Sequence, residues 1–175
     1  MNTSPIPAKS YIRRETLIGC VVNATLATMF AVLLFSQLPI VPVWGANGIA
    51  MDLLPTVFIL TSLGGLALSI ITKQRLNRGI VEPWRPAVVQ RFPVFLASYG
   101  VILRVLIVTL GMTLTIVPVT WLALEALGID SLDFTTFVGF KVLYAPITGA
   151  ISAPWFLKAA LVEPTCVTVG RPTRT

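Results

Sequence analysis

The chain has 175 residues, of which 55% are hydrophobic and 11% are charged, and its mean hydropathy is +0.87. A water-soluble domain carries about 25% charged residues, so this composition argues against a soluble globule. The net charge of +6 favours contact with anionic lipid headgroups over binding to nucleic acid, because the chain is so apolar. The sequence has no histidine, which is the commonest metal ligand and general base.

Four stretches of the sequence are apolar enough to cross a bilayer. The hydrocarbon core is about 30 Å thick and requires about 20 mostly apolar helical residues. We therefore predict an all-α membrane protein with four transmembrane helices, at about residues 16–38, 53–72, 93–127 and 134–161. The third stretch is too long for one straight crossing. Its crossing is predicted at 105–124, with residues 93–103 at the inner headgroup level.

The remaining segments are predicted to be connections. Residues 39–52 are rich in proline and glycine, so we expect a turn-rich outer loop without a regular element. We expect one membrane domain over residues 1–163 and a disordered cytoplasmic tail over residues 164–175, where proline, glycine and threonine recur.

The basic residues indicate how the chain is threaded. Three precede the first span, five lie between the second and third spans, three lie near or beyond the end of the fourth, and the other two connections have none. This alternation follows the positive-inside rule. It predicts two helical hairpins with both termini in the cytoplasm, in a bacterial cytoplasmic membrane, with Lys and Arg against anionic headgroups. Four acidic residues fall on the opposite side: Asp52, Glu125, Asp130 and Asp133.

Two basic residues, Arg104 and Lys141, lie within or against the spans. Charged residues in a membrane are candidate functional residues, and together these two would suit an anionic solute or a lipid headgroup. Both side chains could instead extend to the headgroups, as long basic side chains near helix ends do. Lys141 could also tether a cation-collecting ring of the outer acids, although solvated loop charges and helix starts explain those acids more simply.

Small residues recur every four positions on two of the predicted helices. The residues are Gly19, Asn23, Ala27 and Ala31 on the first helix, and Ala145, Gly149 and Ala153 on the fourth. Small residues let helices approach closely, and the amide of Asn23 can form a hydrogen bond across such a contact or with a polar solute. These faces are predicted to pack against each other or against another subunit, the alternative being a ligand pathway.

We find no catalytic or cofactor site in the sequence. Cys20 and Cys166 are both expected on the cytoplasmic side, where a disulfide is disfavoured, and two thiols without histidine do not make a metal site. The sequence contains no nucleophile pair, phosphate-binding loop or dinucleotide motif. We therefore expect no enzymatic activity, no metal and no cofactor.

Several short motifs carry a resemblance to known proteins. They are Ile12-Arg13-Arg14-Glu15, Pro42-Val43-Trp44-Gly45, Asp52-Leu53-Leu54-Pro55, and the series Phe134, Lys141, Tyr144, Ala153 and Pro154. Through these motifs most of residues 12–160 resembles small uncharacterised four-helix bacterial inner-membrane proteins, some of them labelled permeases. The second half is similar to a two-helix bacterial domain of unknown function. The resemblance implies a place in the membrane and no mechanism.

Together these features favour a non-enzymatic accessory or structural subunit. It would associate with itself or with a larger membrane complex through its small-residue faces. The alternative is a small transporter or channel for an anionic or neutral solute, with Asn23, Arg104 and Lys141 along its path. Such a transporter would have to be an oligomer, because four helices alone enclose little space.

Overall fold

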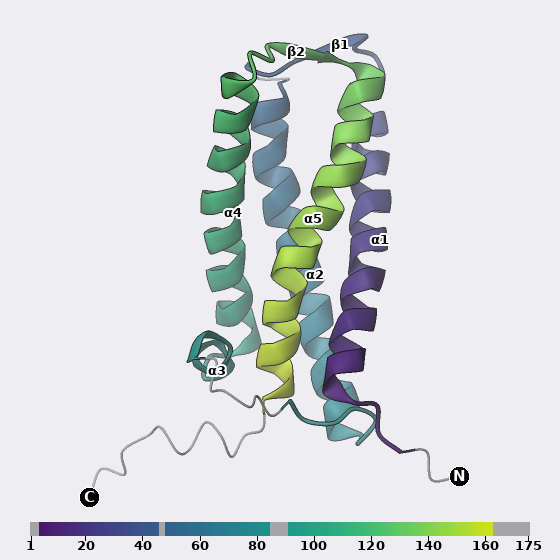
Figure 1. Ribbon diagram of the computed structural model, residues 1–175, viewed down its shortest axis with the longest axis vertical. Coiled ribbons are helices and arrows are strands. Elements are labelled where there is room, and N and C mark those ends of the chain that lie inside the picture. The colour runs from purple at the N-terminus through teal and green to yellow at the C-terminus, as the bar shows by residue number, and fades with distance from the viewer. Residues whose placement is uncertain (1–3, 46–47, 85–90, 163–175) are drawn as a thin grey trace, which may run out of the picture.

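The computed structural model describes residues 4–45, 48–84 and 91–162. These residues form five helices and two short strands (Figure 1). In chain order the elements are α1 (Ala8–Phe35), β1 (Ile40–Pro42), α2 (Ile49–Asn77), α3 (Arg91–Ala97), α4 (Val101–Ala126), β2 (Ser131–Asp133) and α5 (Phe134–Leu161). Four of the helices, α1, α2, α4 and α5, are long and apolar enough to cross a membrane. The predicted helical class is thus confirmed, and the described residues contain the predicted four helices of sufficient length and hydropathy to cross a membrane.

Both helices of the first half extend beyond the predicted apolar spans. α1 begins at Ala8 rather than near residue 16, and α2 continues to Asn77 rather than stopping near residue 72. The added turns contain Lys, Arg and Gln, which are good helix formers. Hydropathy predicts only the apolar part of a helix. It does not predict where the helix begins or ends in the polar sequence on either side.

Glycines end α2 and α4 in the same way. Gly79 and Gly128 have positive φ values of 68° and 65°, a conformation that favours glycine. The amide of Gly79 donates to the carbonyl of Leu76, and the amide of Gly128 donates to the carbonyl of Glu125, at 3.0 and 2.9 Å. These hydrogen bonds satisfy carbonyl groups that would otherwise be unpaired at the helix end.

The single helix predicted at 93–127 is two helices, which corrects that prediction. α3 ends at Ala97, and α4 begins at Val101 directly after Gly100. In Figure 1, α3 lies across one end of the bundle, whereas α4 runs along it. Glycine is unfavourable inside a helix, and one straight helix of this length would exceed the bilayer core. We call this end of the bundle the α3 end.

The predicted outer loop at 39–52 contains a strand, so the prediction of no regular element was wrong. β1 pairs with β2 in an antiparallel arrangement in which Val41 lies opposite Leu132. Val41 and Val43 are fully buried, whereas Ile40 between the turn and Val41 is exposed. This alternation is typical of a strand with one face on a core, but the sequence does not display it, because the exposed residues Ile40, Pro42 and Trp44 are apolar like the buried ones. The strands join the two connections at what we call the strand end.

Asp133 begins α5 as its N-cap residue. Its carboxylate accepts hydrogen bonds from the Thr136 hydroxyl at 2.6 Å and from the Thr136 amide at 2.9 Å. These hydrogen bonds lower the pKa of the Asp133 carboxyl below its ordinary value. The start of α5 is therefore fixed by a side chain that the sequence placed among possible helix starts.

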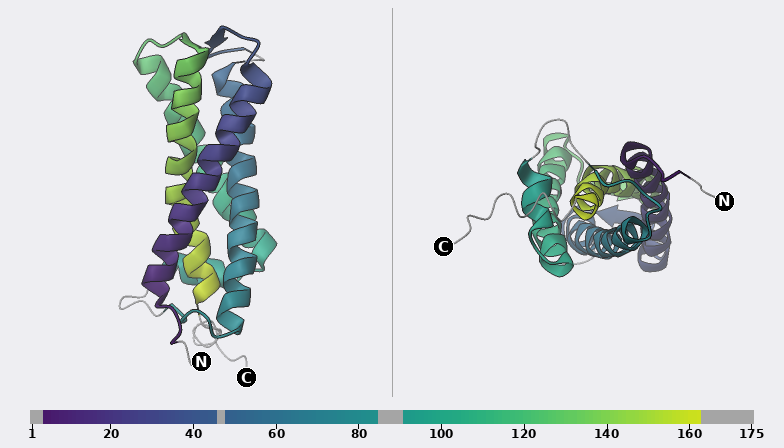
Figure 2. Two further views of the ribbon diagram at one scale, coloured as in Figure 1. Left: turned by 90° about the vertical axis from the view of Figure 1, so that its right-hand side faces the viewer. Right: turned by 90° about the horizontal axis from the view of Figure 1, so that it is seen from below.

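α5 holds the bundle together. It packs most extensively against α1, then against α2, and it also contacts α3 and α4. α2 packs along α4, whereas α1 and α2 contact each other little although they are consecutive crossings. The end-on view of Figure 2 shows α5 among the other long helices. The main packing partners are therefore not the helices that each predicted hairpin would pair.

The two ends of the bundle are closed by apolar clusters. At the strand end the rings of Phe35 and Phe137 lie 4.9 Å apart, below the buried side chains of β1. At the α3 end, Tyr11 packs with Val81 and Leu157. The segment after α2 runs across the α3 end, past the start of α1 and the end of α5. Both ends of the four-helix unit lie at this α3 end (Figure 1).

Candidate functional site

Lys141 is fully buried near the strand end and is paired with an acidic residue. Its ammonium forms an ion pair with the carboxylate of Asp52 in the first turn of α2, and it donates a hydrogen bond of 2.7 Å to the Thr56 hydroxyl. The Phe137 ring lies 5.8 Å from the same ammonium. A charge away from water requires such a partner and such hydrogen bonds. Lys141 therefore links α5 to α2, and an anionic solute would have to displace Asp52.

Arg104 is also buried, at the opposite end of the bundle. Its Nε donates to the carbonyl of Leu96 at 3.1 Å, and its Nη2 donates to the carbonyl of Tyr99 at 3.3 Å. These carbonyls lie at and just beyond the C-terminal end of α3, where the helix dipole favours a cation. Arg104 thus fastens α3 to α4. The structure does not bring Arg104 and Lys141 together into one site.

The two predicted small-residue faces pack against each other within the chain. Their four alanines are buried: Ala27, Ala31, Ala145 and Ala153. Gly149 leaves room for Asn23 at this contact, because a Cβ atom there would lie 2.6 Å from Nδ2 of Asn23 and would force that side chain to move. Gly19 differs, since an added Cβ would have no neighbour within 4 Å. Most of both faces is therefore used inside the monomer, and Gly19 is left free.

Three adjoining cavities form a groove between α1 and α2. Their volumes are about 220, 90 and 540 Å³, from the middle of the bundle toward the strand end. The first two share Leu60, and the second and third share Asp52 and Pro55. α5 contributes Gly149 and Ser152 to the wall of the first cavity. We call these cavities the α1/α2 groove; it exists because α1 and α2 make few contacts.

The middle of the α1/α2 groove contains polar groups without hydrogen-bond partners. Thr61 is 3% exposed, and its hydroxyl has no partner. The amide of Asn23 has none among the hydrogen bonds of the described residues, and both residues line the same cavity. A buried polar group that lacks a partner costs about 1–3 kcal/mol. An acyl chain of a lipid cannot supply that partner, whereas a polar side chain or solute can.

A second ion pair closes the groove toward the α3 end. Arg75 Nη1 on α2 lies 2.6 Å from Glu15 Oε1 on α1, and the Arg75 guanidinium lies over the Tyr11 ring at 5.5 Å. The Tyr11 hydroxyl is hydrogen-bonded to the Thr72 hydroxyl at 3.1 Å. The sequence analysis did not single out this pair. The available signal was Glu15 itself, the one acid before Asp52, which directly follows the basic pair Arg13 and Arg14.

The described residues provide no metal-binding group of three or more His, Cys, Asp or Glu side chains. Cys20 lies at the contact between α1 and α5, where its Sγ donates to the carbonyl of Pro146 at 3.3 Å. Cys166 and the predicted tail at 164–175 lie outside the described residues.

The chain matches no protein-family model, no curated protein and no solved structure. The resemblance to small bacterial inner-membrane proteins therefore stays a prediction. The functional argument depends on the fold and on the α1/α2 groove.

Proposed function

We propose that the protein is a non-enzymatic accessory or structural subunit of a membrane complex, and that a transmembrane helix of a partner protein binds in the α1/α2 groove. The observation that carries this proposal is the buried Thr61 hydroxyl, which has no hydrogen-bond partner and lines an open lateral groove together with the half-buried amide of Asn23. Interhelical hydrogen bonds from Asn and Thr are a common means of association in membranes. The partner helix would carry a polar side chain at this depth.

The length of the groove suits a helix rather than a small molecule. Its α1 wall runs from Glu15 to Phe35, which is about 30 Å of helix and equals the thickness of a bilayer core. Two glycines on its walls, Gly19 and Gly64, have no neighbour within 4 Å of an added Cβ. Free glycines permit the close approach of another helix. The association surface is therefore this groove rather than the paired small-residue faces.

We further propose that the membrane is a bacterial cytoplasmic membrane and that both termini are cytoplasmic. The α3 end carries Lys73 and Arg75 of α2 and the basic residue Arg78 directly after that helix. The positive-inside rule favours this end in the cytoplasm, where basic side chains lie close to anionic headgroups.

Site-specific photo-crosslinking in intact membranes tests the groove. Val22 lines the groove and is 48% exposed, whereas Leu110 on α4 is 49% exposed and lies outside it. With a photoreactive amino acid at position 22 we expect one discrete adduct with another membrane protein, and none from position 110. Gly19→Leu, which fills the groove, should abolish that adduct.

Several results would contradict the proposal. They are the absence of an adduct from position 22, equal adducts from both positions, or an adduct that survives Gly19→Leu. An adduct of twice the chain mass would identify a second copy in place of another protein as the occupant.

A small oligomeric transporter or channel remains the second candidate. It is supported by Asp52, which lines two of the three groove cavities. Flux of anionic and neutral solutes into proteoliposomes distinguishes the candidates. Flux that is lost in the Arg104→Ala and Lys141→Ala double variant, with the protein still folded, would favour the transporter. Unchanged or absent flux would favour the subunit.

A further inference from the structure

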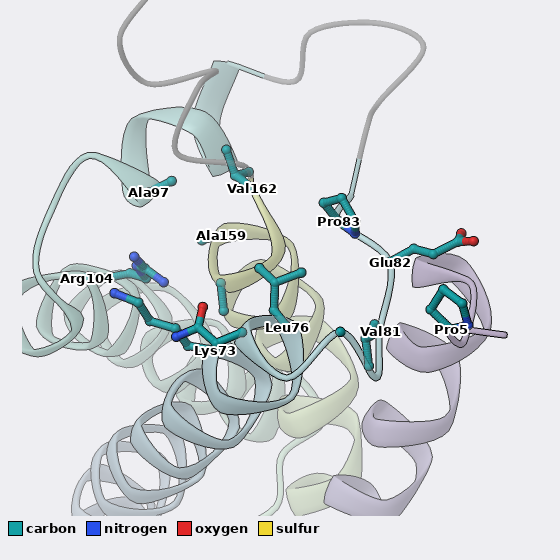
Figure 3. A pocket seen from close by; sticks show the side chains of 13 residues that line it. Pro5, Lys73, Leu76, Val81, Glu82, Pro83, Ala97, Arg104, Ala159 and Val162 are labelled. Atoms are coloured by element: carbon teal, nitrogen blue, oxygen red, sulfur yellow. The ribbon is translucent and has the colours of Figure 1, made fainter. Parts of the chain in front are cut away.

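A cavity of about 660 Å³ opens at the α3 end, apart from the α1/α2 groove (Figure 3). It lies where the end of α2, the start of α4 and the end of α5 meet. One part of its wall is apolar and is formed by Leu76, Ala159, Ala160 and Val162. Another part is cationic. The cavity is therefore amphipathic, with space for more than one small ion.

The cationic part consists of Lys73 on α2 and Arg104 on α4. Figure 3 shows the ammonium of Lys73 and the guanidinium of Arg104 on the same side of the cavity. Arg104 is 7% exposed and is held in place by its hydrogen bonds to the end of α3. Asn77, one helical turn after Lys73, adds a side-chain amide to the lining.

No carboxylate of the described residues neutralises these two cations. Neither Lys73 nor Arg104 forms an ion pair with a described acidic residue. Glu82 also lines the cavity, but Figure 3 shows its carboxylate directed away from Lys73 and Arg104. Two like charges on one wall repel each other, although Lys73 is exposed and water screens part of this repulsion. An anion in the cavity would relieve that repulsion.

The chemistry of the wall favours a phosphate group. Nε and Nη2 of Arg104 donate to backbone carbonyls, so the guanidinium would bind phosphate oxygens through its remaining N–H groups. The Lys73 ammonium adds a point charge, and the Asn77 amide adds a neutral donor. The apolar part of the wall would accommodate the hydrocarbon portion of an amphiphile. A chloride or a carboxylate would use fewer of these donors.

We propose that this cavity binds the phosphate group of an anionic ligand, with Lys73 and Arg104 as its cationic contacts and Asn77 as a neutral donor. The ligand is either the headgroup of an anionic phospholipid or a soluble phosphate ester. Both present the same group to the same side chains. The proposal is independent of the α1/α2 groove and of any partner helix.

Native mass spectrometry of the delipidated full-length chain tests the proposal. The probes are phosphatidylglycerol, phosphatidylcholine as the zwitterionic control, and inorganic phosphate. Lys73→Gln is the main variant, because Lys73 contacts no described acidic group and its loss should not disturb packing. Arg78→Gln is the matched control, since Arg78 carries the same charge at the same end of α2 and does not line the cavity.

We expect Lys73→Gln to weaken phosphatidylglycerol binding about fivefold and Arg78→Gln to leave it unchanged. Weak phosphatidylcholine binding by the unchanged protein would identify an anionic phospholipid. Binding of inorganic phosphate that depends on Lys73 in the same way would instead identify a soluble phosphate ester. Equal losses in the two variants, or no loss in Lys73→Gln, would overturn the proposal. Failure here would leave the groove proposal unaffected.

Discussion

The cations inside the bundle act as links between helices. Lys141 joins α5 to α2, Arg75 joins α2 to α1, and Arg104 joins α4 to α3. Hydropathy identified Arg104 and Lys141 as exceptional because they interrupt apolar sequence. The partners could not be read from the sequence, since Asp52 and Lys141 are far apart in the chain. Arg75 lies just beyond a predicted span and therefore resembled an ordinary loop charge.

Removal of one partner from the buried ion pair should destabilise the protein. Lys141→Met leaves the Asp52 carboxylate buried without its cation, and Asp52→Asn leaves the Lys141 ammonium without its anion. Loss of one partner of a buried pair costs about 3–5 kcal/mol. We therefore expect each single variant to lower the unfolding free energy by about that amount, measured by denaturant titration in micelles.

The Asp52→Asn and Lys141→Met double variant is the control for this prediction. It removes both charges, so it should be more stable than the sum of the single losses indicates. Purely additive losses would show that the two side chains do not stabilise each other.

Acid should weaken the start of α5 through Asp133. The hydrogen bonds from Thr136 lower the pKa of this carboxyl in the folded protein. An aspartate in an unfolded chain titrates near about 3.9. The stabilisation by the cap is therefore complete above that value, and it is lost as the pH falls through the lower folded pKa.

Asp133→Asn tests this dependence, because Asn is also a good N-cap residue and does not titrate. Between about pH 6 and about pH 3, we expect the melting temperature of the variant to fall less than that of the unchanged protein. Asp130→Asn is the control, since Asp130 is exposed and does not begin a helix. The same change in both variants would contradict the assignment.

At the scale of the elements, close approach of α2 and α5 depends on one glycine. A Cβ atom at Gly65 would lie 2.5 Å from the Phe156 ring, and that ring is buried against α4 and α3. The neighbouring Gly64 faces the α1/α2 groove and has no atom within 4 Å of an added Cβ. Both residues lie in the same helix and in the same dipeptide, so they form a matched pair.

Gly65→Ala should therefore lower stability by about 1–3 kcal/mol through overpacking. Gly64→Ala should be neutral or stabilising by up to about 1 kcal/mol, because alanine is the better helix former. Thermal unfolding in the same detergent measures both. Equal effects of the two substitutions would mean that Phe156 moves aside without cost.

The order in which the helices pack was not predictable from the sequence. Lipid chains and protein interiors are both apolar, so an apolar residue does not reveal whether it faces lipid or another helix. The small residues gave partial information: Ala27 and Ala145 do lie in one cluster. Gly19 belongs to the same stripe as the buried alanines, yet it has free space around it because α1 and α2 are separated. That separation could not be read from the sequence.

At the scale of the whole molecule, the two ends of the bundle differ in charge and in construction. The α3 end carries basic residues and a helix that lies across it, whereas the strand end carries Asp130 and Asp133. This difference in charge between the two ends was predictable from the sequence, because the number of basic residues in each connection does not depend on how the helices pack. The sequence did not predict the β1–β2 pair, since the proline and glycine content of residues 39–52 indicated a loop and the exposed side chains of β1 are apolar like the buried ones.

The proposed orientation, with both termini in the cytoplasm, predicts which end of the bundle is accessible from outside the cell. In a background with Cys20→Ala and Cys166→Ser, we expect Ser131→Cys to react with a membrane-impermeant maleimide in intact cells. Ser98→Cys should react only after permeabilisation. Both serines are exposed in the structure and lie at opposite ends. Labelling of position 98 in intact cells would reverse the proposed orientation.

The central position of α5 has a consequence for biogenesis. Of the four long helices in the described residues, α5 comes after the other three in the chain, yet it supplies the principal neighbours of α1, which precedes them all. Until the translocon releases residue 134 and those after it, α1 has little to pack on, because α2 alone scarcely touches it. Before α5 is made, α2 and α4 can already pack together, whereas α1 lacks its main partner.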